Sequence, residues 1–409
     1  MKCKSWPFAF SMLVILTMNS GCAPYDPAKD WIILTDFASQ KPVDDQKAVH
    51  LALQRLHGQD HSETLTTRQR MILAAVYDRL DQPEKAIEQL AEVKDDSAES
   101  ADARLSEGQI YFYKLRMAKP AEKSLLRAIE LDAGKALAWS RLASLYEVQN
   151  RLSERNRCFL KLDDLSALDR DQLLLWTCNR PPDGLIQEKQ KALTEFLTND
   201  GSDNHSRLAL AEELRRKGDY DLSLKVLSDP ESAITEPLLS LLLTELYLDR
   251  GERDQAVSQF QKLDFQKLNQ DQKARYFVLG ARSNFLLGKF SEMESLLKSA
   301  LQLEPLNREA LQLIVQQFRL QKRSSESKEF EQRLSQIDQL EDLAQKARAT
   351  LHRDDSQWIA SIIAISRQLG QLDIARAWLR TQLTKDPLNQ SLQQEIFQLT
   401  QQMKANGRN

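Results

Sequence analysis

The sequence offers few residues whose types and spacing could support catalysis or metal binding. The histidines at i, i+4 spacing are His57 and His61, with Asp60 between them and Gly58 beside them. A zinc site needs three or four converging ligands, and this loop-like segment supplies two. No glycine-rich phosphate loop, serine nucleophile motif or cysteine–histidine arrangement is evident. We therefore expect no catalytic residue, no metal site and no cofactor.

The most regular feature of the chain is instead a sequence motif that recurs about every 34 residues. Glycine, polar residues, a small residue and a large apolar residue follow in phase, most clearly at 218–227, 251–260, 288–297 and 370–379. Such a period is typical of helix–turn–helix arrays. Glycine and proline are scarce, at 12 each in 409 residues, and no alternating β-branched run stands out. The composition therefore predicts an all-α chain.

The repeats resemble the tetratricopeptide repeat. In the clearest unit, the four expected first-helix positions hold Trp139, Leu142, Ala143 and Tyr146, and the large second-helix position holds Phe159. The resemblance covers about residues 67–400 in about nine units. It implies an α-solenoid in which antiparallel helix pairs stack into a right-handed superhelix. The small residues let paired helices approach closely, so we interpret them as packing residues rather than ligand contacts; they are Ala74, Ala86, Ala143, Ala211 and Ala256.

Two stretches depart from the repeat pattern. The unit at about 170–203 lacks the small residues and contains Pro181, Pro182 and Gly184, so we expect a degenerate unit where the solenoid bends. The stretch 321–355 is about a dozen residues too long for one unit. It predicts a lengthened helix followed by an extra helix around 340–351. At the ends of the array we expect an N-terminal helix or cap within 44–66, a last helix at 388–405 with a polar outer face, and a tail at 401–409.

The N-terminal residues 1–21 have the pattern of a secretory signal peptide. Lys2 and Lys4 precede an apolar run over residues 7–18, which is too short to span a bilayer, and Ser20 and Gly21 precede Cys22. Small residues before a cysteine resemble the lipobox of bacterial lipoproteins, which implies acylation of Cys22.

This N-terminal segment leaves alternatives open. Asn19 stands where the lipobox usually has leucine, so ordinary cleavage or an uncleaved anchor would also fit. Because Ala23 rather than aspartate follows Cys22, the resemblance to enterobacterial lipoproteins favours the outer membrane, facing the periplasm. Residues 22–43 read as the lipidated cysteine and a tether with an apolar patch. That patch could dock on the first repeat or contact a partner or membrane.

Cys158 and Cys178 lie in the body of the chain. An exported protein could oxidise them to a disulfide. The repeat pattern places one on an outer helix and the other on an inner-facing helix, which is unfavourable geometry for a bond.

The resemblance also implies a concave surface lined by first-helix residues. Arginines gather in its C-terminal half, where they could bind a peptide's carboxylates and carbonyls. The competing interpretation, that they pair with Glu245, Asp249 and Glu309 between helices, is the one we favour. The candidate partner-binding residues are Tyr113, Lys114, Ser144, Glu147, Glu212, Arg215, Arg216, Glu245, Asp249, Arg282, Phe285, Gln316, Arg319 and Arg367.

These features predict a non-enzymatic scaffold in the bacterial cell envelope, held at the membrane by its lipid anchor. The formal charge of −3 and the acidic residues of the groove argue against nucleic acid. The lysine and asparagine clamp of chaperone-binding relatives is missing, because Ser106 and Ser140 occupy lysine positions. We expect another envelope protein or peptide as partner. The process could be assembly of pili, secretion machinery, exported polysaccharide or outer-membrane proteins. The alternative is an accessory subunit of an enzyme acting on peptidoglycan or glycan.

Overall fold

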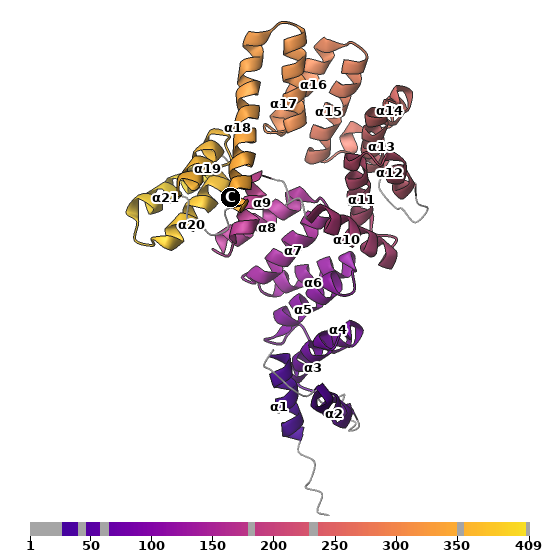
Figure 1. Ribbon diagram of the computed structural model, residues 1–409, viewed down its shortest axis with the longest axis vertical. Coiled ribbons are helices and arrows are strands. Elements are labelled where there is room, and N and C mark those ends of the chain that lie inside the picture. The colour runs from indigo at the N-terminus through magenta and orange to yellow at the C-terminus, as the bar shows by residue number, and fades with distance from the viewer. Residues whose placement is uncertain are drawn as a thin grey trace, which may run out of the picture. The chain divides into compact units, whose positions relative to one another are not determined.

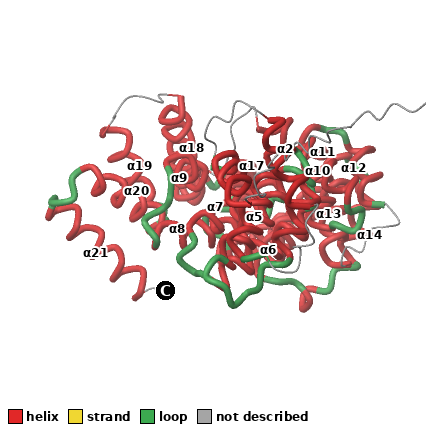
Figure 2. Tube along the Cα trace, turned by 90° about the horizontal axis from the view of Figure 1, so that it is seen from below, coloured by secondary structure: helices red, strands yellow, loops and turns green. Residues whose placement is uncertain are grey.

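The computed structural model describes residues 27–39, 46–57, 65–178, 185–228, 236–349 and 356–405. Across these residues the elements are helices and no strand occurs, as Figure 2 shows. The predicted all-α solenoid of stacked helix pairs is confirmed. The contacts divide the chain into two compact units, residues 1–89 and 90–409, which are described separately.

The first unit contains α1 (Pro27–Ala38), α2 (Gln46–His57), α3 (Thr67–Arg79) and most of α4 (Pro83–Ala91). Helix α1 packs against α2 and α3. Its Leu34 and Phe37 are buried, and the Arg79 guanidinium of α3 lies 4.4 Å from the centre of the Phe37 ring. The apolar patch of the predicted tether is thus a helix that contacts the first repeat.

The second unit begins with two regular pairs of the tetratricopeptide type. Helix α5 (Ser100–Tyr113) packs against α6 (Ala118–Leu131), and α7 (Ala136–Val148) packs against α8 (Leu152–Asp164). Ala121 and Ala143 are buried where the repeat pattern requires small residues. Tyr146 is also buried, as expected for a core residue, and its hydroxyl donates a hydrogen bond to Glu122.

A longer stack follows in the same unit. Its pairs are α11 (Asn204–Lys217) with α12 (Tyr220–Leu227), α13 (Glu236–Arg250) with α14 (Arg253–Gln261), α15 (Gln270–Leu286) with α16 (Phe290–Leu303), and α17 (Arg308–Leu320) with α18 (Ser324–Ala349). A short 3-10 helix, Phe265–Lys267, joins α14 to α15. The chain ends with α19 (Ser356–Gln368), α20 (Leu372–Lys385) and α21 (Gln390–Ala405).

The turn inside each pair needs a residue in the left-handed region. The recurring glycines Gly218, Gly251, Gly288 and Gly370 have φ between +70° and +86°. The same turn holds Asp81, Arg116, Asn150 and Lys322 in other pairs, with φ of +50° to +57°. The repeating glycine is therefore explained by backbone geometry, and four pairs adopt it without glycine at some cost in strain.

The predicted degenerate unit is where the stack divides. Its two helices, α9 (Arg170–Cys178) and α10 (Leu185–Asn199), pack in different directions. Helix α10 packs against α7 and α11, whereas α9 packs against α8, α18 and α20. Figure 1 shows α9 beside α18, a segment far away in sequence. Pro181, Pro182 and Gly184 lie outside the described residues.

This arrangement closes the second unit onto its own middle. The Trp378 indole of α20 donates a hydrogen bond of 2.9 Å to the Thr177 hydroxyl of α9. Arg376 of α20 forms an ion pair of 2.7 Å with Asp163 of α8. We call this set of contacts the closing contact. A repeat array that simply extended would not bring these helices together.

The extra helix expected at 340–351 is wrong as far as the structure describes that stretch. Helix α18 is a single helix of 26 residues that ends at Ala349. Leu340, Ala344 and Ala347 are buried one turn apart along it. Because α18 packs on α9, this apolar stripe is covered by a partner helix and the helix has no reason to break. Helix α21 runs to Ala405, into the predicted tail, and Gln398, Gln401, Gln402 and Lys404 on it are exposed as predicted.

Candidate functional site

The candidate groove residues of α11, α13 and α15 meet in one network of ion pairs. Arg215 lies 3.4 Å from Glu245 and also pairs with Asp249. Asp249 in turn accepts a 2.6 Å hydrogen bond from Arg282, which lies 3.4 Å from Glu309 of α17. Four consecutive first helices are therefore linked through their predicted concave residues.

A residue that the sequence reasoning missed completes this network. Arg275 of α15 pairs with Glu245 and lies 3.2 Å from Glu212 of α11. Arg275 and Arg282 are seven residues apart, which places both on one face of α15. That spacing was the available signal, but Arg275 lies seven residues before Arg282, outside the groove positions counted from the repeat. The interhelix network consists of Glu212, Arg215, Glu245, Asp249, Arg275, Arg282 and Glu309.

Charges in the interhelix network nearly balance. Three guanidinium groups face four carboxylates, and the side chain of Glu245 is only 9% exposed. Burial works to raise the pKa of Glu245, but the charges of Arg275, Arg215 and Arg282 outweigh it and lower that pKa. Arg215 and Arg282 are thus matched by carboxylates of neighbouring helices, as the favoured interpretation had it. Partner binding by these residues stays a prediction.

Helix α10 covers the face of the preceding pairs where the groove was expected to begin. Phe196 is fully buried, with its ring 5.8 Å from that of Phe112 on α5. Asn199 donates a hydrogen bond to the Leu115 carbonyl, and Glu195 pairs with Arg116 at 3.0 Å. Part of this chain therefore packs next to Tyr113 and Lys114, which themselves stay exposed.

The remaining candidates make local contacts. Tyr113 is 42% exposed and lies under the guanidinium of Arg141. Glu147 pairs with Arg155 of α8. Arg216 pairs with Glu213 at 3.2 Å on its own helix, and Phe285 makes an edge contact with Phe290. Arg367 reaches Glu395 of α21 at 3.3 Å, within the group of helices that follows α18. The structure thus joins Glu212, Arg215, Glu245, Asp249 and Arg282 in one network, whereas these other candidates make separate contacts.

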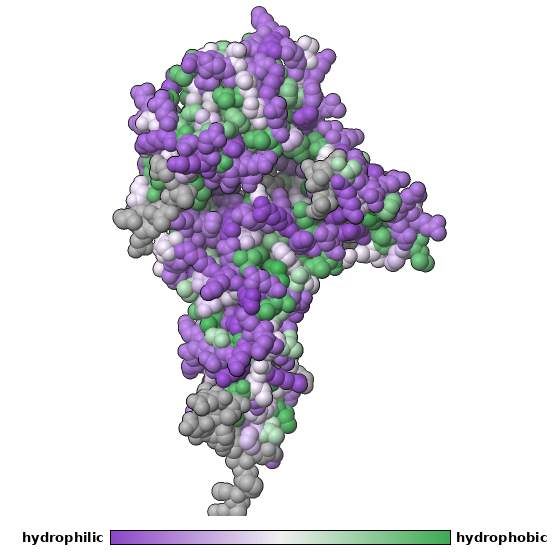
Figure 3. Space-filling model, turned by 180° about the vertical axis from the view of Figure 1, so that it is seen from behind, coloured by the Kyte–Doolittle hydropathy of each residue, from purple (hydrophilic) through white to green (hydrophobic). Residues whose placement is uncertain are grey.

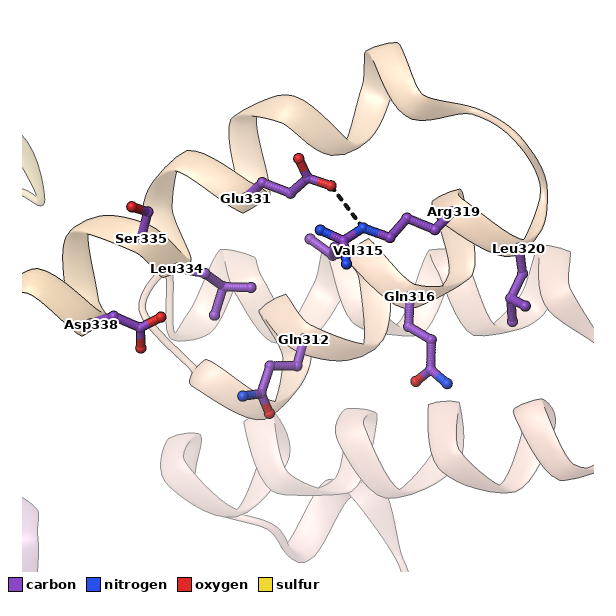
Figure 4. Close-up of a pocket in the computed structure, with 9 residues that line it drawn as sticks. All are labelled: Gln312, Val315, Gln316, Arg319, Leu320, Glu331, Leu334, Ser335 and Asp338. Carbon is purple, nitrogen blue, oxygen red and sulfur yellow. Dashed lines mark hydrogen bonds and ion pairs between the residues drawn. The ribbon is translucent and has the colours of Figure 1, made fainter.

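An open groove lies between α17 and α18, beside the predicted Arg319 and Gln316. It measures about 580 Å³, and Figure 4 shows Arg319 and Glu331 reaching toward each other across it, at 3.0 Å. Val315 and Leu334 supply apolar walls, and Leu320 at the rim is 58% exposed. We call it the α17–α18 groove. Its lining mixes apolar and polar side chains.

The described residues offer little for redox or metal chemistry. No group of three histidine, cysteine or acidic side chains is placed to hold a metal ion among them. Cys158 and Cys178 are buried and not joined in a disulfide, and burial raises the pKa of Cys158 to about 12. The described part of the chain has no helix long and apolar enough to cross a bilayer. Cys22, His61 and the His57 side chain lie outside the described residues.

Comparisons with known proteins find distantly similar solved structures and no matching family model. No family model matches it, and no curated protein is significantly similar. The human IFIT1 dimer with m7Gppp-AAAA is 11% identical over 94% of this chain and 87% of that chain, with a TM-score of 0.35. The P58(IPK) TPR domain is 16% identical over 84% and 99%, with a TM-score of 0.28. Pseudomonas aeruginosa pilF is 12% identical over 73% and 97%, with a TM-score of 0.20. At such values, the ligands of these proteins carry no argument for this chain.

Proposed function

We propose that this chain is an exported, lipid-anchored scaffold that binds another envelope protein and helps to assemble a multiprotein complex of the bacterial envelope. The α17–α18 groove is the observation that supports partner binding most directly. It combines apolar walls with a rim of Gln312, Gln316 and Arg319. An extended or helical segment could bury apolar side chains there and pair its polar groups with the rim.

The groove fits a partner better than the interhelix network does. Arg319 has a side chain that is 66% exposed and pairs with one carboxylate, whereas Arg282 is 20% exposed and pairs with two. A ligand could recruit Arg319 at small cost. Recruiting Arg282 would break contacts between three helices.

Leu320→Glu tests this proposal, because Leu320 lies at the groove rim. Leu287→Glu is a matched control. Leu287 directly follows α15, Leu320 is the last residue of α17, and the two are 57% and 58% exposed. After crosslinking in native membranes, we expect one envelope protein to be recovered with wild type and Leu287→Glu and lost with Leu320→Glu. Equal recovery from both variants would exclude the α17–α18 groove as the binding surface.

The anchor has a separate test. Cys22→Ser removes the acylated thiol and should move the protein from the membrane fraction to the soluble periplasmic fraction, together with loss of labelling by a radioactive fatty acid. A single substitution suffices because membrane attachment by acyl chains requires that thiol. An unlabelled wild-type protein that fractionates like Cys22→Ser would point to ordinary cleavage. If the captured partner is a hydrolase or synthase of glycan, the scaffold serves as its accessory subunit.

A further inference from the structure

Closure of the second unit creates a cleft that a simple solenoid would not have. It measures about 980 Å³ and lies among α8, α9, the α16–α17 turn, α18 and the α19–α20 turn. Across the same region, Ser153 of α8 donates a 2.6 Å hydrogen bond to Asp271 of α15. We call this space the inner cleft. Its volume is that of a site for a compact ligand or a few peptide residues.

The walls of the inner cleft carry an excess of negative charge. Glu304, Glu309, Glu341 and Asp373 line it, against Arg308 as the lining base. Arg308 is already engaged, because Glu341 accepts hydrogen bonds of 2.6 and 2.7 Å from it and Asp338 pairs with it as well. Arg282 beyond the wall lies 3.4 Å from Glu309. Even with both arginines counted, carboxylates outnumber cations.

Glu304 shows the consequence of that imbalance. Its hydrogen-bond donor is the neutral amide of Asn307, at 2.8 Å. Burial raises the pKa of Glu304, and the nearby charge of Asp271 adds to the effect. A cation placed in the inner cleft would relieve this cost.

Neutral groups of the cleft point to the same kind of ligand. The Oε1 atom of Gln371 is buried and accepts no hydrogen bond from the described residues. A buried acceptor without a hydrogen bond carries a desolvation cost, and an N–H donor from a ligand would remove it. Trp176 and Leu340 add apolar wall, on which the methylene stem of a long basic side chain can pack.

From these observations we infer that the inner cleft binds an arginine- or lysine-bearing segment of a partner protein. The basic head pairs with Glu304 and its neighbours and donates to Gln371, while the stem packs on the apolar wall. The inference rests on the proposed scaffold function and adds a second contact on a different surface from the α17–α18 groove. It assigns the partner a basic segment.

The test uses the purified full chain and a fluorescein-labelled pentapeptide that alternates glycine and arginine. Wild type should bind it, with weaker binding at higher salt, and a counterpart with glutamate in place of arginine should not bind. Glu304→Gln should raise the Kd about fivefold or more, because it removes a carboxylate without changing shape. Glu329→Gln, on the same helix as Glu341 but with a 69% exposed side chain, should leave the Kd unchanged.

Three results would overturn the inference: no binding of the arginine peptide by wild type, equal loss in Glu304→Gln and Glu329→Gln, or binding of spermidine without binding of the peptide. A photo-crosslinking version of the peptide locates the site, and crosslinks outside α9, α18 and the α16–α17 turn would also count against it. The Leu320→Glu capture is independent of Glu304, so failure of one experiment does not decide the other.

Discussion

The interhelix network and the closing contact both hold helices together with ion pairs, but over different chain distances. In the network, Arg215 and Arg282 reach Asp249 across 34 and 33 residues, about one repeat. In the closing contact, Arg376 reaches Asp163 across 213 residues and Trp378 reaches Thr177 across 201. Neighbouring repeats meet wherever the array forms. Distant repeats meet only if particular side chains form contacts that offset the entropy lost when the chain between them is ordered.

Burial separates the two regions as well. The side chains of Asp163 and Arg376 are 3% and 8% exposed, whereas those of Asp249 and Arg282 are each 20% exposed. A charge that loses its partner in the closing contact is poorly solvated, because little water reaches it. We therefore expect changes there to have larger effects, even though the network has more ion pairs.

Trp378→Ala should produce the largest effect. Trp378 is 2% exposed, and its loss removes a large buried ring and the hydrogen bond to Thr177. The expected cost is about 3–5 kcal/mol, taken mainly from the attachment of α20 to α9. Hydrogen exchange should show faster exchange of α9 and α20 amides while α13 and α15 stay protected.

Trp139→Ala is the matched control, since Trp139 belongs to a regular pair and is only half-buried. It should cost less and leave α20 protected. If Trp378→Ala accelerated amide exchange in α11–α17 as much as in α9 and α20, the closing contact would not be a separate structural element.

Asp163→Asn and Asp249→Asn compare the two regions with one chemical change. Asp163→Asn leaves Arg376 and Arg380 facing a neutral group, with Asp164 at 3.3 Å from Arg376 as partial compensation. We expect a loss of about 2–3 kcal/mol. Asp249→Asn lies in a more solvated network and should cost about 1 kcal/mol. Denaturation followed at α9 and at α13 by hydrogen exchange measures both, and a reversed order would refute the burial argument.

Glu245→Gln should alter the pH dependence of the α11–α17 stack. The folded-state pKa of Glu245 lies below its ordinary value of 4.5, because the arginines outweigh burial. The unfolded state therefore binds the proton more readily, so this carboxylate stabilises the fold above pH 4.5. That contribution is lost as the pH falls below 4.5 and through the folded pKa. At neutral pH the variant should lose about 1–3 kcal/mol, since Arg275 then keeps only Glu212, at 3.2 Å, as its ion-pair partner.

The same variant should have a flatter acid limb of unfolding free energy against pH than wild type. Glu326→Gln serves as control, because Glu326 has a lowered pKa from Arg323 but lies on the surface of α18. If the unfolding free energy of Glu245→Gln fell with acid as steeply as that of wild type, groups other than Glu245 would be responsible for the acid sensitivity.

Sequence periodicity was enough to predict the local part of the fold. Ala143, Ala211 and Ala256 had to be small because paired helices cross there, and the structure buries all three. The break near Pro181 was visible in the sequence, but the direction in which α9 and α10 leave it was not. Thr177 and Trp378 look like ordinary residues of their own repeats. Only the three-dimensional arrangement shows that they belong to a joint between distant repeats.

The candidate site was predictable to a similar degree. Counting repeat positions found Arg215 and Arg282, and balancing them against Glu245 and Asp249 correctly favoured ion pairing. Arg275 was missed because it lies seven residues before Arg282, outside the counted positions. The inner cleft could not be foreseen, since its walls come from helices that periodicity does not place together.

The turns inside the helix pairs give the smallest effect and a test of the repeat itself. Gly251 has φ of +75° with no atom within 4 Å of an added Cβ, so Gly251→Ala should cost about 1 kcal/mol through backbone strain alone. Lys322 occupies the same turn of the α17–α18 pair at φ +57° and is exposed. Lys322→Gly should therefore stabilise that pair by up to about 1 kcal/mol, less the entropy that glycine adds to the unfolded chain. If local hydrogen exchange shows a loss of stability in Gly251→Ala and a gain in Lys322→Gly, the two pairs share one turn geometry. If both variants destabilise, Lys322 is held there by contacts that glycine cannot replace, and the α17–α18 pair is then set apart from the regular stack by its turn as well as by its length.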